Sequence, residues 1–265
     1  MTEQQNKPTL AGITNMSAVK NQPIRLGLQG PPGSGKTTSA LTFPGVLVLD
    51  FDHGLQAFAG QDVRTVPFYS SDWIIQYGFK PTSPIGGPNR RDAFLKWLRE
   101  EAPKLVASDT LVVDSWSTVQ DAFDLQTSLE PKYTKEGKID DYDFWERKIE
   151  FSREVMIRLN GLRCNVIVCF HETQIRDAKT GMLLDKIAPL MQGKFVARIK
   201  QYFSDYFRCS VETTEVKDAS GKVIETKRNY VWQVNSNALF DAKRRSLQTD
   251  KLFVPAHYSS LDQTS

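Results

Sequence analysis

The chain of 265 residues contains little cysteine and little histidine. Its three cysteines, Cys164, Cys169 and Cys209, form no C-x-x-C pair, and an odd number does not make a disulfide framework. Cys164 and Cys169 flank or lie in an apolar run, so we expect them to behave as small buried hydrophobic residues. His53 and His257 have no partner at a spacing typical of a metal site. The sequence therefore indicates neither a disulfide-rich domain nor a histidine-based metal centre, and a reducing compartment is expected.

The sequence also lacks long apolar runs and a strong net charge. No stretch is long and apolar enough to cross a membrane, and the polar start MTEQQNKPTL does not resemble a signal peptide. The formal net charge of +3 neither requires nor excludes a nucleic-acid partner. This charge is uneven, because residues 194–251 contain twelve Lys or Arg and seven Asp or Glu. Composition thus excludes few functions, and the motifs must decide.

The most informative motif is a phosphate-binding loop. Residues 30–37 read GPPGSGKT, which matches the pattern G-x-x-x-x-G-K-[ST] at every fixed position. Glycines let backbone N–H groups point toward a phosphate, Lys36 would reach the β- and γ-phosphates, and Thr37 would bind Mg²⁺. A plain Gly/Pro-rich turn is the alternative, but it has no use for Gly-Lys-Thr in this order. The predicted nucleotide-binding residues are Gly30, Pro31, Pro32, Gly33, Ser34, Gly35, Lys36, Thr37 and Thr38.

Apolar runs and amphipathic segments alternate on either side of this motif. Alternation in 24–29 predicts a strand before the loop, and a helix is expected over 37–43 after it. Further buried strands are predicted at 46–50, 110–114 and 166–170, with 64–68 as another candidate, and helices at 92–106, 117–129 and 144–159. This alternation is typical of an α/β fold with a parallel sheet.

The pattern changes beyond Pro189. Residues 194–202 are predicted to be helical, and 206–214 and 223–234 are predicted to form an antiparallel hairpin at the sheet edge. We expect a flexible arm over residues 1–22, an ATPase core over 23–251 and a polar tail over 252–265.

Polar residues stand where the predicted parallel strands end, at one edge of the sheet. Asp114 ends a strand and can hold Mg²⁺, although an aspartate there can also merely cap the next helix. Many P-loop ATPases have a catalytic Glu after this Asp, but Ser115 stands here, so the group that orients the attacking water must come from elsewhere. Asp52 is our candidate and Glu172 its rival, and Asp52 as a simple loop carboxylate is the alternative.

His171 follows the strand at 166–170 and has two open interpretations. It can contact the water at the γ-phosphate and report hydrolysis to the next segment, or it can be a partly buried histidine bonded to backbone. The sequence does not decide between them.

In their order along the chain and in their residue types, these motifs resemble the RecA-type recombinase ATPase core. GPPGSGKT corresponds to the phosphate loop, DFDH at 50–53 to the strand with the catalytic acid, LVVDS at 111–115 to the magnesium strand, and 166–171 to the strand that couples nucleotide state to DNA binding. The resemblance covers about 24–245 and extends to compact phage-encoded RecA-like ATP-binding proteins, including the single-strand annealing group. Two departures are Asp52 in place of Glu and His171 where RecA carries Gln.

This resemblance implies the fold class and the chemistry. It implies an α/β RecA-like P-loop NTPase core, with a mostly parallel central sheet flanked by helices and a C-terminal antiparallel hairpin extension. It also implies a DNA-stimulated ATPase that uses ATP and Mg²⁺, with Thr37 and Asp114 as metal ligands. The implied catalytic residues are Lys36, Asp52, Asp114, His171 and Glu172, together with Lys243 and Arg245 as cations donated to a neighbouring protomer. A surface cluster is the alternative for these last two.

The resemblance further implies single-stranded DNA as a partner, self-association into a head-to-tail filament or ring, and annealing or strand pairing in phage recombination. A single-strand-binding protein is a further candidate partner, no membrane partner is expected, and the implied location is the cytoplasm of a bacterial host. By position, two DNA-binding loops match 130–141 and 173–194, although charged loops are often only solvated. Their candidate residues are Lys132, Tyr133, Lys135, Lys138, Arg176, Lys179, Lys186 and Lys194.

Two other functions fit the same phosphate loop. One is another P-loop DNA motor or loader of the helicase or packaging type. The other is a regulatory ATP-binding module that acts on a protein partner.

Overall fold

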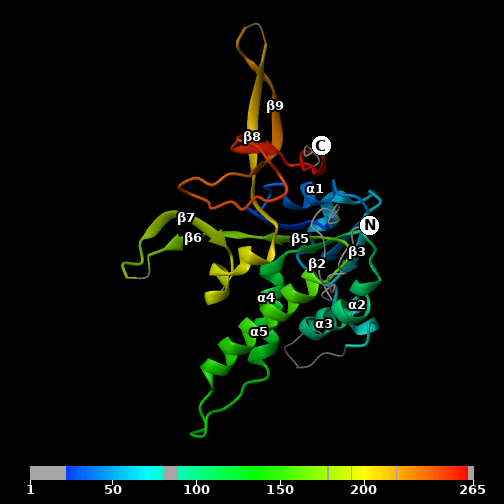
Figure 1. Ribbon diagram of the computed structural model, residues 1–265, viewed down its shortest axis with the longest axis vertical. Coiled ribbons are helices and arrows are strands. Elements are labelled where there is room, and N and C mark those ends of the chain that lie inside the picture. Colours follow the sequence, from blue (N-terminus) through cyan, green and yellow to red (C-terminus); the bar gives the residue numbers. More distant parts are fainter. Residues whose placement is uncertain (1–21, 80–88, 178, 192, 219, 262–265) are drawn as a thin grey trace, which may run out of the picture.

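The computed structural model describes residues 22–79, 89–177, 179–191, 193–218 and 220–261. Within these residues an eight-stranded sheet lies at the centre, in the order β10-β9-β8-β1-β5-β4-β2-β3 (Figure 1). All neighbours from β8 to β3 run parallel, whereas β9 and β10 pair antiparallel. The strands are β1 Arg25–Gln29, β2 Val46–Asp50, β3 Arg64–Pro67, β4 Thr110–Asp114, β5 Asn165–Phe170, β8 Asp205–Lys217, β9 Val223–Gln233 and β10 Phe253–Pro255.

The central strands are apolar on both faces because both faces of the sheet are covered. In β5, Val166, Val168 and Phe170 belong to one hydrophobic cluster, and the alternating Ile167 and Cys169 belong to another. Side chains of a strand point to opposite faces in turn, so each strand contributes to both clusters. This burial explains why these strands are continuous apolar runs in the sequence.

Helices cover the two faces unequally. Helix α1 (Lys36–Ala40) contributes Ala40 to the cluster on one face. The other cluster receives residues from four helices: α2 Ser71–Gln76, α3 Arg90–Glu100, α4 Trp116–Ser128 and α5 Asp141–Asn160. Asp140 caps α5, because its side chain accepts hydrogen bonds from the backbone N–H groups of Tyr142 and Asp143. No helix within the described residues is long and apolar enough to cross a membrane.

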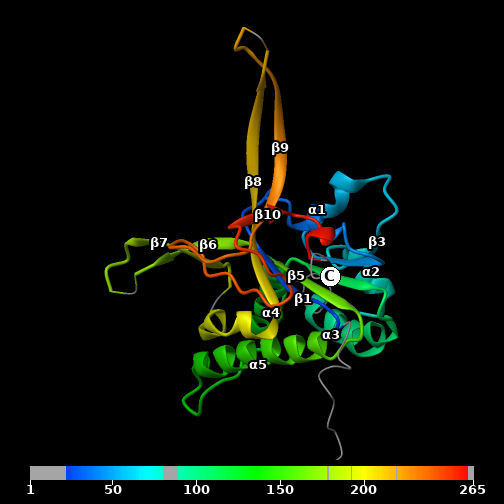
Figure 2. The ribbon, with the colours of Figure 1, turned by 45° about the horizontal axis from the view of Figure 1, so that its top comes forward.

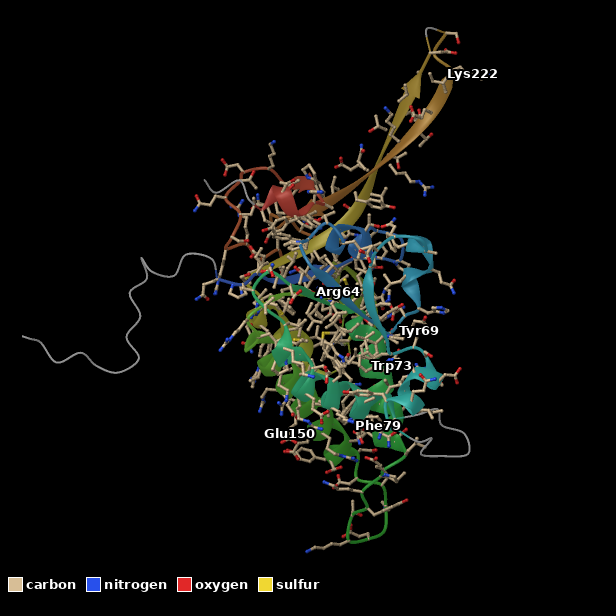
Figure 3. The ribbon with its side chains drawn as sticks, turned by 90° about the vertical axis from the view of Figure 1, so that its right-hand side faces the viewer. Arg64, Tyr69, Trp73, Phe79, Glu150 and Lys222 are labelled. Carbon is tan, nitrogen blue, oxygen red and sulfur yellow. The ribbon has the colours of Figure 1, made fainter. Side chains whose placement is uncertain are left out.

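Three segments project from this core in different directions (Figures 1 and 2). The first is the outer part of the β8–β9 hairpin, which we call the ribbon (residues 211–230). The second is a separate two-stranded hairpin of β6 (Glu172–Arg176) and β7 (Leu183–Pro189). The third is the connection between α4 and α5, at 130–140, where Tyr133 and Ile139 form an isolated bridge. Figure 3 shows Lys222 near the outer end of the ribbon, well away from the core.

The structure confirms the expected α/β class, with a mostly parallel central sheet, flanking helices and an antiparallel hairpin extension. The predicted helix over 92–106 ends earlier, since α3 stops at Glu100 and a 3₁₀ turn, η3 (Ala102–Lys104), accommodates Pro103. The predicted helix over 194–202 is wrong in type, because the segment forms two 3₁₀ turns, η4 (Lys194–Ala197) and η5 (Ile199–Tyr202). Two 3₁₀ turns lie elsewhere, at η2 (Gly54–Phe58) and η6 (Tyr258–Ser260).

The segment assigned to a polar tail contains structure. Phe253–Pro255 forms β10, and Val254, Ala256 and Leu261 are buried in the cluster that also holds Ala40. The expected N-terminal arm lies outside the described residues except for residue 22, as do residues 262–265.

The core position of Leu28 gives a stability prediction. Leu28 on β1 is fully buried, so Leu28→Ala should lower the free energy of unfolding by about 2–5 kcal/mol. The matched variant Leu129→Ala, at a side chain that is 39% exposed, should change it by less than about 0.5 kcal/mol. Urea denaturation followed by circular dichroism measures both. Equal effects would contradict the placement of β1 at the centre of the sheet.

Candidate nucleotide-binding site

The phosphate loop connects β1 to α1 and has the geometry that its glycines allow. Gly33 and Gly35 have φ of +74° and +87°, a region that residues with a Cβ rarely adopt. The Lys36 ammonium donates hydrogen bonds to the carbonyl oxygens of Gly30 and Pro31, both at 2.9 Å. The Ser34 hydroxyl is buried and has no hydrogen-bond partner among the described residues. The loop therefore holds a buried cation and an unpaired hydroxyl at the start of a helix.

Thr37 and Asp114 meet across the edge of the sheet. The Thr37 hydroxyl donates a hydrogen bond of 2.6 Å to Asp114 Oδ2. The Asp114 side chain is buried, and Asp50 lies opposite it in the β2–β4 register. A hydroxyl and a carboxylate oxygen at this separation are the hard oxygen donors that Mg²⁺ prefers, so the residues fit a magnesium ion bound with a nucleotide. Burial raises the pKa of Asp114, the hydrogen bond from Thr37 opposes this, and Asp52 and Asp50 reinforce it.

Asp52 and His171 form a pair that links two strand ends. His171 Nε2 and Asp52 Oδ2 lie 3.0 Å apart, and the Thr118 hydroxyl donates to the other carboxylate oxygen. Burial alone would raise the pKa of Asp52. Hydrogen bonds from His171, Thr118 and Ser115 outweigh burial and leave that pKa below its usual value. Asp52 is thus held ionised, and the His171 ring contacts a carboxylate through Nε2 while its buried Nδ1 has no hydrogen-bond partner among the described residues.

A single hydroxyl anchors both ends of the β6–β7 hairpin. The Ser117 side chain on α4 accepts a hydrogen bond from the His171 backbone N–H at 3.3 Å and donates one to the Leu190 carbonyl at 3.0 Å. The Leu190 N–H also donates to the His171 carbonyl at 2.7 Å. The hairpin therefore starts and ends at the His171 side of the site.

Glu172, the rival base, is engaged elsewhere. Its carboxylate accepts two hydrogen bonds from the Arg208 guanidinium on β8, at 2.9 and 3.0 Å. The hydrogen bonds to Glu172 raise the pKa of Arg208. Both carboxylate oxygens are occupied in this bidentate pair with a cation, whereas the two Asp52 oxygens contact a hydroxyl and an imidazole.

The basic cluster expected to act on a neighbouring protomer is partly bound within its own chain. The Lys243 ammonium donates to the carbonyl oxygens of Lys200, at 3.0 Å, and Phe203. Burial and the nearby Arg245 lower the pKa of Lys243. Arg245 is exposed, and its side chain has no hydrogen bond or ion pair among the described residues. The structure therefore presents Arg245, and not Lys243, as an available cation.

The two segments expected to contact DNA project from different parts of the core (Figure 1). In the first, Lys132 forms an ion pair with Asp143, and Tyr133 is 63% exposed. The second is the β6–β7 hairpin and not an irregular loop, and Lys194 lies beyond it at the start of η4. The remaining basic side chains of both segments are exposed: Lys135, Lys138, Arg176, Lys179 and Lys186.

Sequence reasoning found these residues one by one and missed several contacts between them. It named Asp52 and His171 but not their pairing, and it did not name Thr118. It also missed Tyr230 of β9, whose ring lies directly against Gly35. No local pattern signals such contacts, because they join segments far apart in the chain.

Strand β5 lies between β1, which leads into the phosphate loop, and β4, which ends in Asp114. A family model described as an AAA domain (AAA_24) matches residues 22–246. The chain belongs to this family. Membership in the AAA domain family, together with the phosphate loop, implies a nucleotide-binding P-loop domain.

Among solved structures, the crystal structure of the RadB recombinase is similar at 14% sequence identity and a TM-score of 0.36. The match covers 80% of this chain and 88% of that chain. No curated protein matches the chain significantly.

The lowered pKa of Asp52 predicts a dependence of stability on pH. A carboxylate with a depressed folded-state pKa contributes stability above its unfolded pKa of about 4, and this contribution is lost as pH falls through the folded value. Asp52→Asn should therefore be less stable than the unmodified protein at neutral pH, and the difference should shrink in acid. Thermal unfolding from neutral pH down to about pH 3 measures this, with the exposed Asp62→Asn as control. A loss of stability in Asp52→Asn that is the same at every pH would contradict this prediction.

Proposed function

We propose that this AAA domain protein is a Mg²⁺-dependent ATPase that binds single-stranded DNA and self-associates. The observation that carries the proposal is the 2.6 Å contact between Thr37 and Asp114 beside the buried Lys36. A loop lysine, a loop hydroxyl and a carboxylate on a neighbouring strand are the parts with which P-loop proteins hold a nucleoside triphosphate and its metal.

Each residue of the site has a role in this proposal. The loop backbone and Lys36 bind the phosphates, and Thr37 and Asp114 hold Mg²⁺. When bound, the metal offsets charge on the phosphate oxygens. For Lys36 to contact phosphate, its ammonium leaves the carbonyl oxygens of Gly30 and Pro31, which are 2.9 Å away. Nucleotide binding thus exchanges two neutral acceptors for anionic ones, which form stronger hydrogen bonds.

Asp52 is the proposed group that orients the attacking water and accepts its proton. Its lowered pKa keeps the carboxylate ionised, and Thr118 and His171 hold its two oxygens in place. We assign the role to Asp52 because Glu172 is bound through both oxygens to the Arg208 guanidinium, whereas the partners of Asp52 are a hydroxyl and an imidazole. A shorter acid than Glu at this position still suits water orientation, because its geometry is fixed from two sides.

The proposed link to DNA runs through His171. The residue after it begins β6, so a change at the Asp52–His171 pair is transmitted directly to the β6–β7 hairpin. This hairpin carries Arg176, Lys179 and Lys186 on its exposed surface, where cations can contact DNA phosphates. Annealing or strand pairing in phage recombination, and head-to-tail assembly with Arg245 as the cation given to a neighbour, rest on the sequence resemblance.

The charge of the ribbon favours a second candidate function. Residues 211–230 contain four basic and four acidic side chains, and the strand faces beyond the core are exposed. A two-stranded ribbon without a covered face is marginally stable in water, and a neutral surface suits a protein partner better than DNA. A regulatory ATP-binding module that acts on a protein would use such a surface. ATP binding without stimulation of turnover by single-stranded DNA would identify it.

The first functional prediction concerns Lys36. Lys36→Ala should lower the rate of ATP hydrolysis by at least about 100-fold, because one fixed cation at the phosphates is lost. The fold should persist, since the lysine contacts only loop carbonyls. Phosphate release with and without single-stranded DNA, at two salt concentrations, measures the rate and its stimulation. Normal turnover in this variant would sink the phosphate-loop assignment.

A second functional prediction distinguishes Asp52 from Glu172 as the general base. Asp52→Asn should lower kcat by about 100-fold or more, since general-base assistance is lost. Glu172→Gln should leave kcat close to that of the unmodified protein, because its carboxylate serves Arg208. Single-turnover hydrolysis measures both. A large loss in Glu172→Gln alone would transfer the role to Glu172.

A further inference from the structure

The base of the β8–β9 hairpin forms one wall of the phosphate loop. A Cβ added to Gly30 would lie 2.7 Å from the Cys209 carbonyl oxygen of β8. A Cβ added to Gly35 would lie 2.3 Å from Cδ1 of Tyr230 on β9. Both distances are shorter than van der Waals contact, so two glycines of the loop are needed for this close approach. Tyr230 is 36% exposed, and its ring lies against the residue that precedes Lys36.

The pairing of β8 and β9 shows which side chains share the face of Tyr230. Opposite residues of an antiparallel pair lie on one face, and the face repeats every second residue. The pairs Cys209–Trp232, Val211–Tyr230 and Thr213–Arg228 therefore share a face. Cys209 and Trp232 are buried in the cluster that contains Ala40 of α1, so this face is the α1 side of the sheet.

Strand β9 follows helix α1 toward the loop. Trp232 Nε1 donates a hydrogen bond of 3.3 Å to the Ser39 hydroxyl, and Tyr230 contacts Gly35, the residue before the helix. The step from Ser39 to Gly35 covers about 6 Å along the helix, and the step from Trp232 to Tyr230 covers about 7 Å along the strand. The strand therefore runs alongside the helix toward the phosphate loop. The next residue on this face, Arg228, lies about 7 Å beyond Tyr230.

Arg228 is an unengaged cation at this position. It is exposed, and its side chain has no hydrogen bond or ion pair within the residues that the structure describes. The opposite residue, Thr213, is neutral, so it offers the guanidinium no counter-charge. An arginine presents several N–H donors in a planar arrangement that suits phosphate oxygens.

We propose that Arg228 binds the phosphate groups of the nucleotide in the loop of its own chain, and that Tyr230 is the residue that positions the ribbon for this contact. The proposal rests on the proposed function, since it requires that the loop binds a nucleoside triphosphate. It makes the β8–β9 hairpin part of the nucleotide site. It also assigns a phosphate-binding cation within the chain, in addition to Arg245 donated from a neighbour.

The neighbouring Lys227 provides a matched control. It is also exposed and basic, but it pairs with Thr214 on the opposite face of the ribbon. That face continues to Arg208, which is bound to Glu172 of β6. Lys227 lies 3.8 Å from Glu225 on the same face. Loss of charge at either position changes the net charge of the ribbon equally, so general electrostatic effects cancel in the comparison.

The test is direct binding of a non-hydrolysable ATP analogue with Mg²⁺ to the full chain, measured by isothermal titration calorimetry. Arg228→Gln should weaken binding about tenfold, as expected for one lost charge-assisted hydrogen bond. Lys227→Gln should stay within about twofold of the unmodified protein, which is below the cost of such a bond. Equal affinities for Arg228→Gln and Lys227→Gln would overturn the proposal.

Two variants of Tyr230 test its positioning role. Tyr230→Phe keeps the ring carbons that contact Gly35 and should bind the analogue as the unmodified protein does. Tyr230→Ala removes the ring and should weaken binding, and adding Arg228→Gln to it should cost less than in the unmodified background. Full additivity of the two changes would contradict the positioning role. Lys36→Ala distinguishes failure of the two proposals. If Lys36→Ala binds the analogue normally, the proposed function fails. If Lys36→Ala loses binding but Arg228→Gln does not, only the role of Arg228 is refuted.

Discussion

The contact between Thr37 and Asp114 is the constraint on which the site depends. The two residues are far apart in the chain and meet because β1, β5 and β4 are parallel and end at the same edge of the sheet. Strand β5 separates the other two, so the loop after β1 must reach across it. The short helix α1 starts within that loop and places Thr37 over the carboxylate. The apolar clusters on both faces fix the strands, and the strands fix the distance between the two oxygens.

Asp50, Asp52 and Asp114 at this edge of the sheet differ in the direction in which their surroundings shift their pKa values. Burial raises the pKa of both Asp114 and Asp50, whereas hydrogen bonds from three side chains lower that of Asp52. The fold therefore maintains negative charge at Asp52 and penalises it at Asp114. In the proposed function, this difference corresponds to a carboxylate that orients water at Asp52 and one that binds a cation at Asp114. Residues of one chemical type thus have pKa values shifted in opposite directions by their surroundings.

The sequence predicted those features that local chemistry determines. The phosphate loop follows from its fixed residues, and β2, β4 and β5 follow from short apolar runs that end in a polar residue or, for β5, are followed by His171. What it could not predict depends on segments distant in the chain. The pairing of Asp52 with His171 and the contact of Tyr230 with Gly35 each need the complete sheet. Strand β10 was missed because Phe253–Pro255 is short and borders a polar segment. The 3₁₀ turns at 194–202 follow an apolar pattern that a helix would share.

The anchoring of the β6–β7 hairpin at Ser117 has a mechanical consequence. Both ends of the hairpin are tied to one hydroxyl, and the rest of it extends away from the core. Glu172 is also bound to Arg208, and the Ile187 N–H donates to the Leu239 carbonyl, so these attachments lie near the base of the hairpin. A body held near its base responds to a push there by tilting. Its tip then travels farther than its base, in proportion to its length. A displacement of the His171 ring too small to disturb the central sheet would therefore sweep the outer end of the hairpin through a much larger arc.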